Sequence, residues 1–258
     1  MGKEIKNNLV TLKFKKMKRQ IKKIALLIIA ILGVNSVNAQ IDFSIHLGML
    51  LPQGDYALSN MNKGKVVWMS ETSRAGAGLG FDAGVKIRYG IPFVKGLGVF
   101  ATADFFLNTP NKDVKNWKYD YIESYNNSNT ISKIEISSFN YMNIPIMIGA
   151  NYEYEIEDNV KIWGEGALGI NIGIFPTRKI THFLYTGMWD TEMSVHTNRN
   201  PASFAFQFGA GVMFKDRYSL GVHYYSLGTQ EYKLTGHPET DFVDIHPSMF
   251  TIRLGYHF

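Results

Sequence analysis

The chain has 258 residues, of which 45% are hydrophobic and 14% aromatic, and it contains no Cys. The lack of Cys excludes disulfide-stapled small folds and thiolate metal sites. The formal net charge is +5, but residues 1–39 carry nine Lys and Arg against one Glu, and the rest of the chain carries 18 basic and 21 acidic residues. The basic surplus therefore gives no support to nucleic-acid binding, and we expect no nucleic-acid partner.

The N-terminal segment has the three parts of a secretory signal peptide. Seven Lys and Arg between positions 13 and 23 precede the apolar run 24–32, and a Val-x-Ala sequence ends at Ala39. We expect cleavage between Ala39 and Gln40, so that residues 1–39 are signal peptide and residues 40–258 form one mature domain. A membrane-anchor helix is the alternative, but it needs about 20 apolar residues, roughly twice this run. Met17 is an alternative start to Met1.

The mature segment is dominated by a period of two, which predicts β-strands. In residues 79–89, for example, Leu, Phe, Ala, Val, Ile and Tyr alternate with Gly, Asp, Lys and Arg. The predicted strands are 41–49, 79–89, 97–107, 133–154, 160–174, 204–214, 218–224 and 250–258. Pro145 lies inside the fourth of these, where it cannot donate to a strand ladder, so we expect a β-bulge there.

The connections between these strands alternate in length. Long connections span 52–73, 108–132, 175–201 and 226–247, whereas 90–96, 155–159 and 215–217 are short turns. All long connections therefore lie at one end of the sheet. This asymmetry is typical of outer-membrane barrels, which have long outer loops and short periplasmic turns.

Alternation alone does not decide which face of the barrel is polar, because a soluble lipocalin-like barrel has its apolar face inside. The interior of an eight-stranded barrel is barely wide enough for side chains. Phe204, Phe206 and Phe208 on one strand would overfill it, whereas the Gly-rich opposite face fits. We therefore expect an all-β fold, a single eight-stranded antiparallel transmembrane β-barrel in the outer membrane of a Gram-negative bacterium.

The same alternation assigns a set of polar side chains to the lumen. Charges in so narrow a space must pair, because an isolated buried charge costs several kcal/mol. We interpret the set as a structural ion-pair network and not as a relay or pore. It consists of Asp42, His46, Asp82, Lys86, Arg88, Asp104, Glu153, Lys161, Glu165, His223 and Arg253, with Gln207 and His257 on the same face.

The spacing of nucleophilic and metal-ligating residues does not predict an enzyme. Ser219, His223 and Glu165 share a face, but positions four apart on a strand are separated by about 13 Å, beyond hydrogen-bond reach. The loop histidines lack the spacing of a metal site. We expect no catalytic residue, metal or cofactor. An outer-membrane barrel enzyme, lipid A-modifying or proteolytic, and a small-solute channel are the alternatives.

Four segments resemble the PorT-like outer-membrane β-barrel family. They are Leu47–Tyr56, Tyr141–Ile148, Ile162–Ala167 and Ile252–Phe258. The last resembles the aromatic C-terminal signal read by the barrel-assembly machinery, with Gly255, Tyr256 and Phe258. The resemblance implies a small barrel, similar in architecture to the OmpX and OmpA barrels, surrounded by outer-membrane lipid and lipopolysaccharide. It also implies an accessory role in protein secretion or surface assembly, with secretion-system proteins as partners.

The long connections are where such partners would bind. Aromatic residues in them form either a contact surface or an outer girdle of hairpins that extend past the membrane. These aromatic residues are Trp117, Tyr119, Tyr121, Tyr125, Phe183, Tyr185 and Trp189.

Overall fold

The computed structural model describes residues 41–58, 75–116, 131–137, 140–174, 179–184, 189–190, 195–198, 202–235 and 242–258. The predicted signal peptide and its cleavage site between Ala39 and Gln40 lie outside the described residues, as do Trp117, Tyr119, Tyr121, Tyr125 and Tyr185. Among the described residues, no helix has the length and apolar character needed to cross a bilayer.

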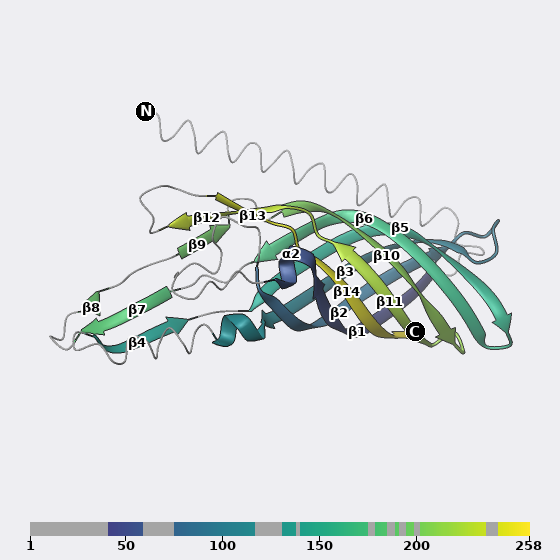
Figure 1. The fold of residues 1–258 in the computed structure, drawn as a ribbon. Helices are drawn as coiled ribbons and strands as arrows, with labels where there is room; N and C mark the ends of the chain where they lie inside the picture. The colour runs from purple at the N-terminus through teal and green to yellow at the C-terminus, as the bar shows by residue number, and fades with distance from the viewer. Residues whose placement is uncertain are drawn as a thin grey trace, which may run out of the picture. The chain divides into compact units, whose positions relative to one another are not determined.

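Eight strands close into an antiparallel barrel, and the predicted fold class is confirmed (Figure 1). Each strand pairs with two neighbours, in the order β1-β14-β11-β10-β6-β5-β3-β2, and β1 closes the ring by pairing with β14 and β2. The barrel strands are β1 (Ile41–Gln53), β2 (Ala77–Gly90), β3 (Leu97–Pro110), β5 (Tyr141–Glu157), β6 (Val160–Ile174), β10 (Ala202–Phe214), β11 (Tyr218–Ser226) and β14 (Ser248–His257).

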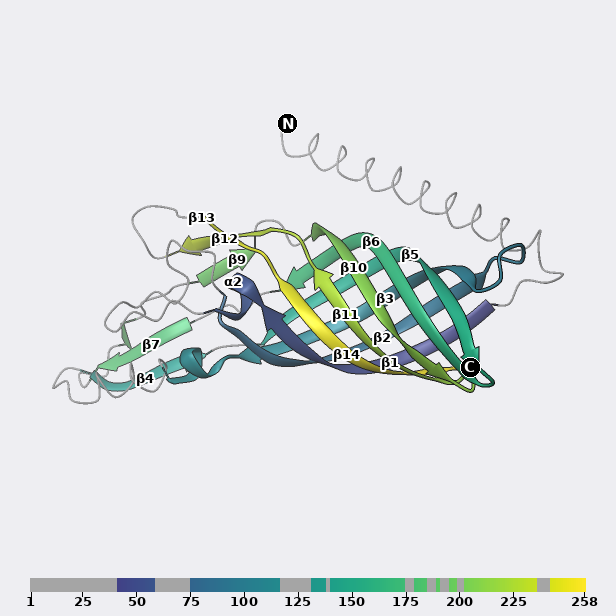
Figure 2. The same ribbon diagram turned by 45° about the vertical axis from the view of Figure 1, so that its right-hand side comes forward.

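The three short turns, the start of β1 and the C-terminus lie at one end of the barrel, which we call the turn end (Figure 2). The opposite end, where the long connections leave the strands, is the loop end. In the turn after β10, the backbone N–H of Arg217 donates to the carbonyl of Phe214 over 3.1 Å, and Lys215 and Asp216 both have positive φ. A two-residue turn of this kind matches the twist of the paired strands.

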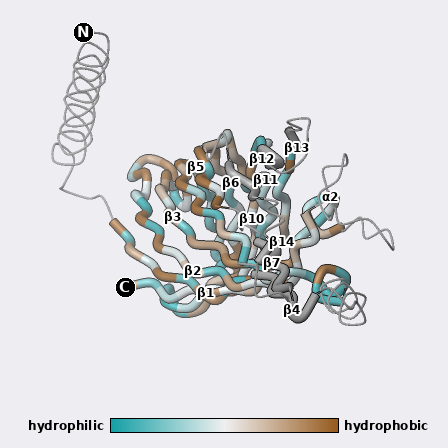
Figure 3. The backbone as a smooth tube through the Cα atoms, turned by 90° about the vertical axis from the view of Figure 1, so that its left-hand side faces the viewer, coloured by the Kyte–Doolittle hydropathy of each residue, from teal (hydrophilic) through white to brown (hydrophobic). Residues whose placement is uncertain are grey.

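The outward side chains of the barrel strands are apolar and remain exposed. Leu254, Ile148 and Phe204 are 67%, 70% and 63% exposed, although each would be buried in a water-soluble fold. Their inward neighbours Arg253, Met147 and Ser203 are buried. Figure 3 shows the alternation of hydrophobic and hydrophilic residues along β1, β2 and β3. The apolar face therefore points outward, as the side-chain volumes predict.

The seam between β1 and β14 ends in aromatic contacts. The backbone N–H of Phe258 donates to the carbonyl of Phe43 over 2.9 Å, and their ring centroids lie 5.5 Å apart. The ring of Phe258 also packs edge-on against Tyr256. Gly255 and Tyr256 thus lie on β14 and Phe258 follows directly after it, beside β1, and their role as an assembly signal stays a prediction.

The predicted fourth strand is wrong in its extent. Residues 133–154 do not form one strand, because β4 (Ile131–Ser137) belongs to a separate sheet and the barrel strand β5 begins at Tyr141. β4 pairs with β7 (Lys179–Leu184), which pairs with β8 (Trp189–Asp190). A second small sheet orders β13 (Phe242–Ile245), β12 (Gln230–Thr235) and β9 (Val195–Asn198). The periodicity of β4 matched that of β5, so sequence alone joined them.

Pro145 causes no bulge, contrary to the prediction. The register between β5 and β6 is unbroken through the pair Pro145 and Asn171. On the β3 side, the ladder is interrupted between the pairs Ala103 with Ile146 and Phe106 with Asn143, and it resumes in the same register. The missing donor of Pro145 is therefore accommodated by a local gap in one ladder, without an extra residue.

Candidate functional site

The lumen holds a central cluster built around Arg253. Its guanidinium donates through Nε to Asp82, and its Nη2 lies 3.5 Å from Oδ1 of Asp104. Asp104 also contacts Nε2 of His46 at 2.7 Å and accepts hydrogen bonds from Thr102 and Tyr225. The residues come from β1, β2, β3, β11 and β14, so the cluster spans the β1–β14 seam. Buried charges of opposite sign offset each other's desolvation here.

His46, Asp82 and Asp104 offer ligand atoms within 4.8 Å of one another, which is close enough to hold a metal ion. Arg253 already contacts both carboxylates of this group, so a cationic side chain supplies the positive charge that a metal would bring. The donor set therefore fits an ion-pair cluster better than a metal site.

A second cluster surrounds Glu165 on β6. Lys86 Nζ donates to one of its carboxylate oxygens, and the other lies 3.2 Å from both His223 Nε2 and Gln207 Nε2. Lys86 also lies 4.2 Å from the ring centroid of Phe100. Partners from β2, β10 and β11 thus reach Glu165 from different sides of the barrel.

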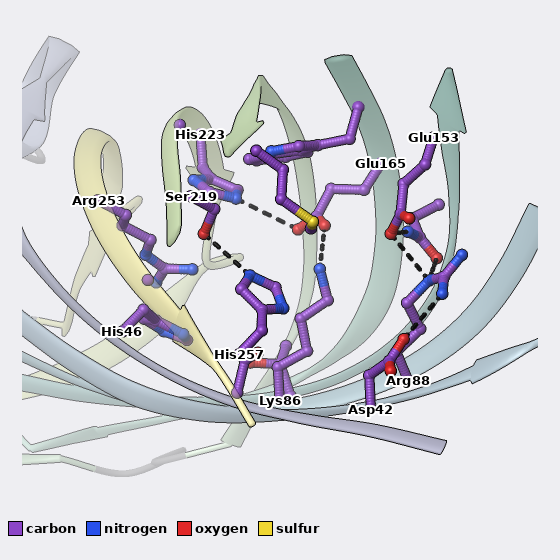
Figure 4. A pocket seen from close by; sticks show the side chains of 17 residues that line it. Asp42, His46, Lys86, Arg88, Glu153, Glu165, Ser219, His223, Arg253 and His257 are labelled. Carbon is purple, nitrogen blue, oxygen red and sulfur yellow. Dashed lines mark hydrogen bonds and ion pairs between the residues drawn. The ribbon is translucent and has the colours of Figure 1, made fainter. Parts of the chain in front are cut away.

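A third cluster lies near the turn end, around Arg88. Its guanidinium contacts Asp42 at 3.0 Å, Asn151 at 3.0 Å and Glu153 at 3.1 Å. Figure 4 shows Arg88 between the two carboxylates. Lys161 belongs to none of these clusters, although its parity assigned it to the network. Its Nζ pairs with Asp216 in the turn after β10, over 2.5 Å, because Lys161 lies next to that turn.

The loop end of the lumen is closed by residues that the sequence reasoning missed. α2 (Gly54–Ala57) places Tyr56 in the barrel, where it is fully buried and packs edge-on against Tyr141 at 5.9 Å between centroids. Asn143 Nδ2 donates to the Tyr56 hydroxyl over 3.3 Å, and Asn171 donates to Asn143. We call Tyr56, Tyr141, Asn143 and Asn171 the cap. The sequence signal that could have identified the cap was the position of Tyr141, Asn143 and Asn171 on the lumen-facing side of their strands.

Burial raises the pKa of Tyr56 above its ordinary value of 10.0. The unfolded chain therefore loses this proton near pH 10, whereas the folded barrel keeps it, and stability must fall as the pH rises above 10. We expect the free energy of unfolding of the wild type to fall more steeply between pH 10 and 11 than that of Tyr56→Phe, by up to about 1.4 kcal/mol per pH unit. Urea unfolding of the refolded barrel at a series of pH values measures this, with Tyr141 and Tyr225 unchanged in both proteins. Parallel curves would show that Tyr56 ionises equally in both states.

Ser219 and His223 do not contact each other, as their spacing predicted. The structure pairs each with a different residue. Nε2 of His223 lies 3.2 Å from Glu165, whereas Oγ of Ser219 lies 3.0 Å from Nε2 of His257. All four side chains line one pocket inside the barrel (Figure 4). The histidine beside Ser219 was missed because it comes from the neighbouring strand, not from the same one.

The apolar exterior of the closed barrel suits contact with lipid. The ion pairs in its lumen compensate the charges that are buried there. A membrane-spanning sheet must be closed so that no backbone group is left unpaired in hydrocarbon. Among the described residues, every barrel strand pairs with a neighbour on each side, so the barrel has no edge strand. The protein is an outer-membrane β-barrel. Long loops on one end and short turns on the other follow the usual orientation, with the turn end in the periplasm.

A scan of protein families finds no match for the chain, and a search of curated proteins finds none either. Similar solved structures include Neisserial surface protein A, at 12% identity and a TM-score of 0.46, covering 85% of this chain and 97% of that one. The attachment invasion locus protein Ail of Yersinia pestis is 15% identical with a TM-score of 0.35, covering 84% and 98%. OprG from Pseudomonas aeruginosa is 13% identical with a TM-score of 0.43, covering 84% and 95%. At these identities no function passes to this chain.

Proposed function

We propose that this outer-membrane barrel is an accessory of protein secretion or surface assembly that acts through its extracellular loops and periplasmic turns. The observation that carries the proposal is that ion pairs cross the lumen and the cap closes its loop end. Three ion-pair clusters occupy its middle and turn end, and Tyr56 and Tyr141 close its loop end. A barrel closed in this way offers its connections to large partners, and two small sheets are built into those connections.

The PorT-like resemblance supports the same proposal. Two of the segments that carry it, Leu47–Tyr56 and Tyr141–Ile148, meet at the cap, where Tyr56 packs on Tyr141 and Asn143 donates to the Tyr56 hydroxyl. A motif pair that meets in space serves one structural purpose, which is to hold the base of the loops over the barrel. We propose outer-membrane lipid, lipopolysaccharide, the barrel-assembly machinery and secretion-system proteins as partners.

A native gel of mild-detergent outer-membrane extract tests the proposal. We expect the mature chain to migrate in a large assembly, and deletion of the protein to change the set of secreted and surface proteins. A variant in which a short Gly-Ser linker replaces the hairpin of β12 and β13 should insert in the membrane but leave the assembly. Its matched control is Gly164→Ala, which changes neither a loop nor a turn and should stay in the assembly. Migration as a lone species with unchanged secretion would overturn the proposal.

A further inference from the structure

The pocket inside the barrel contains a serine and a histidine in hydrogen-bond contact near the turn end. Ser219 on β11 and His257 on β14 lie on adjacent strands, diagonally across the pair Ser219 and Gly255. Their Oγ and Nε2 atoms are 3.0 Å apart, within the range for a nucleophile and its general base. Figure 4 shows both side chains pointing into the pocket.

Gly255 leaves the space in which this contact forms. A Cβ atom at position 255 would collide with Oγ of Ser219 and would lie 3.7 Å from Nε2 of His257. The pocket continues to the turn end, where the side chains of Asp42 and Glu153 stay 25% and 11% exposed. Ser219 is the second residue of β11, so the contact lies close to the turn end, where we expect a small molecule in the periplasm to meet it.

Two hydrogen-bond donors lie one pleat deeper in the same pocket. Arg253 pairs in register with Gly221, two residues beyond Ser219 on β11, and the Trp163 ring fills the space above Gly221. Within the described part of the chain, Nε1 of Trp163 is buried without a hydrogen-bond acceptor, and Nη2 of Arg253 has only the 3.5 Å contact to Asp104. One pleat is about 7 Å, so these donors can contact a polar group of the substrate that lies beyond the carbonyl attacked by Ser219.

We propose that Ser219 and His257 form a catalytic dyad that hydrolyses small acyl esters entering from the periplasm. The Ser219 Oγ forms a bond to the acyl carbon while its proton moves to Nε2 of His257. The ester C–O bond then breaks, and His257 returns that proton to the leaving alcohol. A water molecule attacks the acyl-serine, gives a proton through His257 to Oγ, and releases the carboxylic acid. This inference is independent of the proposed secretion role, and it departs from the expectation, drawn from strand spacing, that the protein is no enzyme.

A fluorophosphonate probe tests the dyad on the purified, refolded barrel. In the probe reaction, Oγ of Ser219 displaces fluoride from phosphorus. We expect a covalent adduct on the peptide that contains Ser219, detected by mass spectrometry, and hydrolysis of p-nitrophenyl acetate above that of the heat-denatured protein. Ser219→Ala should abolish both. Ser248→Ala, which removes a hydroxyl at the opposite, loop end of β14 and outside the pocket, should leave both unchanged.

His257→Gln separates a catalytic role from a structural one. We expect it to slow labelling of Ser219 by a factor of about 100 to 10,000, the usual contribution of a general base. A gel shift on heating, retained in each variant, is the criterion that the variant is folded. An unlabelled wild-type Ser219, or labelling at the same rate in His257→Gln, would overturn the proposal. Because both readouts use the isolated barrel, they do not depend on any secretion partner.

Discussion

We expect Asp82→Ala to lower the free energy of unfolding by about 3 to 5 kcal/mol, the usual cost of removing one partner of a buried ion pair. Asp82 is fully buried, and its carboxylate accepts from Nε of Arg253. Without it, the only carboxylate contact that the Arg253 guanidinium keeps is the longer one to Asp104, at 3.5 Å. The pair joins β2 to β14 across Gly48 of β1. Its loss therefore weakens the contact between the N-terminal and C-terminal strands of the barrel. Urea unfolding of the barrel in lipid vesicles measures the change.

Two matched variants identify the cause of this loss. Asp42→Ala removes a carboxylate from the turn end, where it is 25% exposed and where Arg88 keeps Glu153 and Asn151, so we expect a loss below about 1 kcal/mol. The double variant Asp82→Ala with Arg253→Met should recover part of the stability, because it removes the uncompensated charge. A double variant that is less stable than Asp82→Ala alone would show that packing, and not charge, dominates the cluster.

We expect Gly169→Ala to destabilise the barrel by about 1 to 3 kcal/mol or to prevent its assembly. Gly169 on β6 faces the lumen side of the sheet, and an added Cβ would collide with the backbone carbonyl of Ile146 and lie 2.7 Å from Cα of Met147. These are backbone atoms of the neighbouring strand β5, so no side-chain rotation relieves the collision. To make room, β5 and β6 would have to move apart, and both are held by a neighbouring strand on their other side.

Gly164→Ala is the matched control, because it adds the same methyl group to the same strand. The nearest atom to its Cβ would be the carbonyl oxygen of Gly209, at 4.0 Å, and the methyl group would point outward. We expect its stability to stay within about 0.5 kcal/mol of the wild type. Refolding yield, read from the gel shift on heating, and urea unfolding compare the two. Equal losses in both variants would indicate a general intolerance of β6 to alanine.

The sequence by itself determined the barrel and which residues face its lumen. Strand side chains alternate strictly, so the parity of Asp82, Glu165 and Arg253 followed from their own strands without any knowledge of neighbours. The outward direction of Phe204 and Phe208 followed from volume alone, because an eight-stranded lumen cannot hold them. Turn positions such as Asp216 followed from local backbone chemistry. These features depend on residues close together in the chain.

Only the tertiary structure decided which lumen residues meet. Parity places a side chain inside the barrel, but the stagger and tilt of eight strands decide which strand it faces and at what depth. Lys86 therefore pairs with Glu165 across the lumen, whereas Lys161 pairs with Asp216 in a turn. Ser219 contacts His257 and not His223. The cap depends on the return of α2 into the loop end, and the separation of β4 from β5 depends on pairing with β7. Contacts between distant segments depend on how all eight strands close into a ring. The residue pattern within a single strand contains no information about that closure.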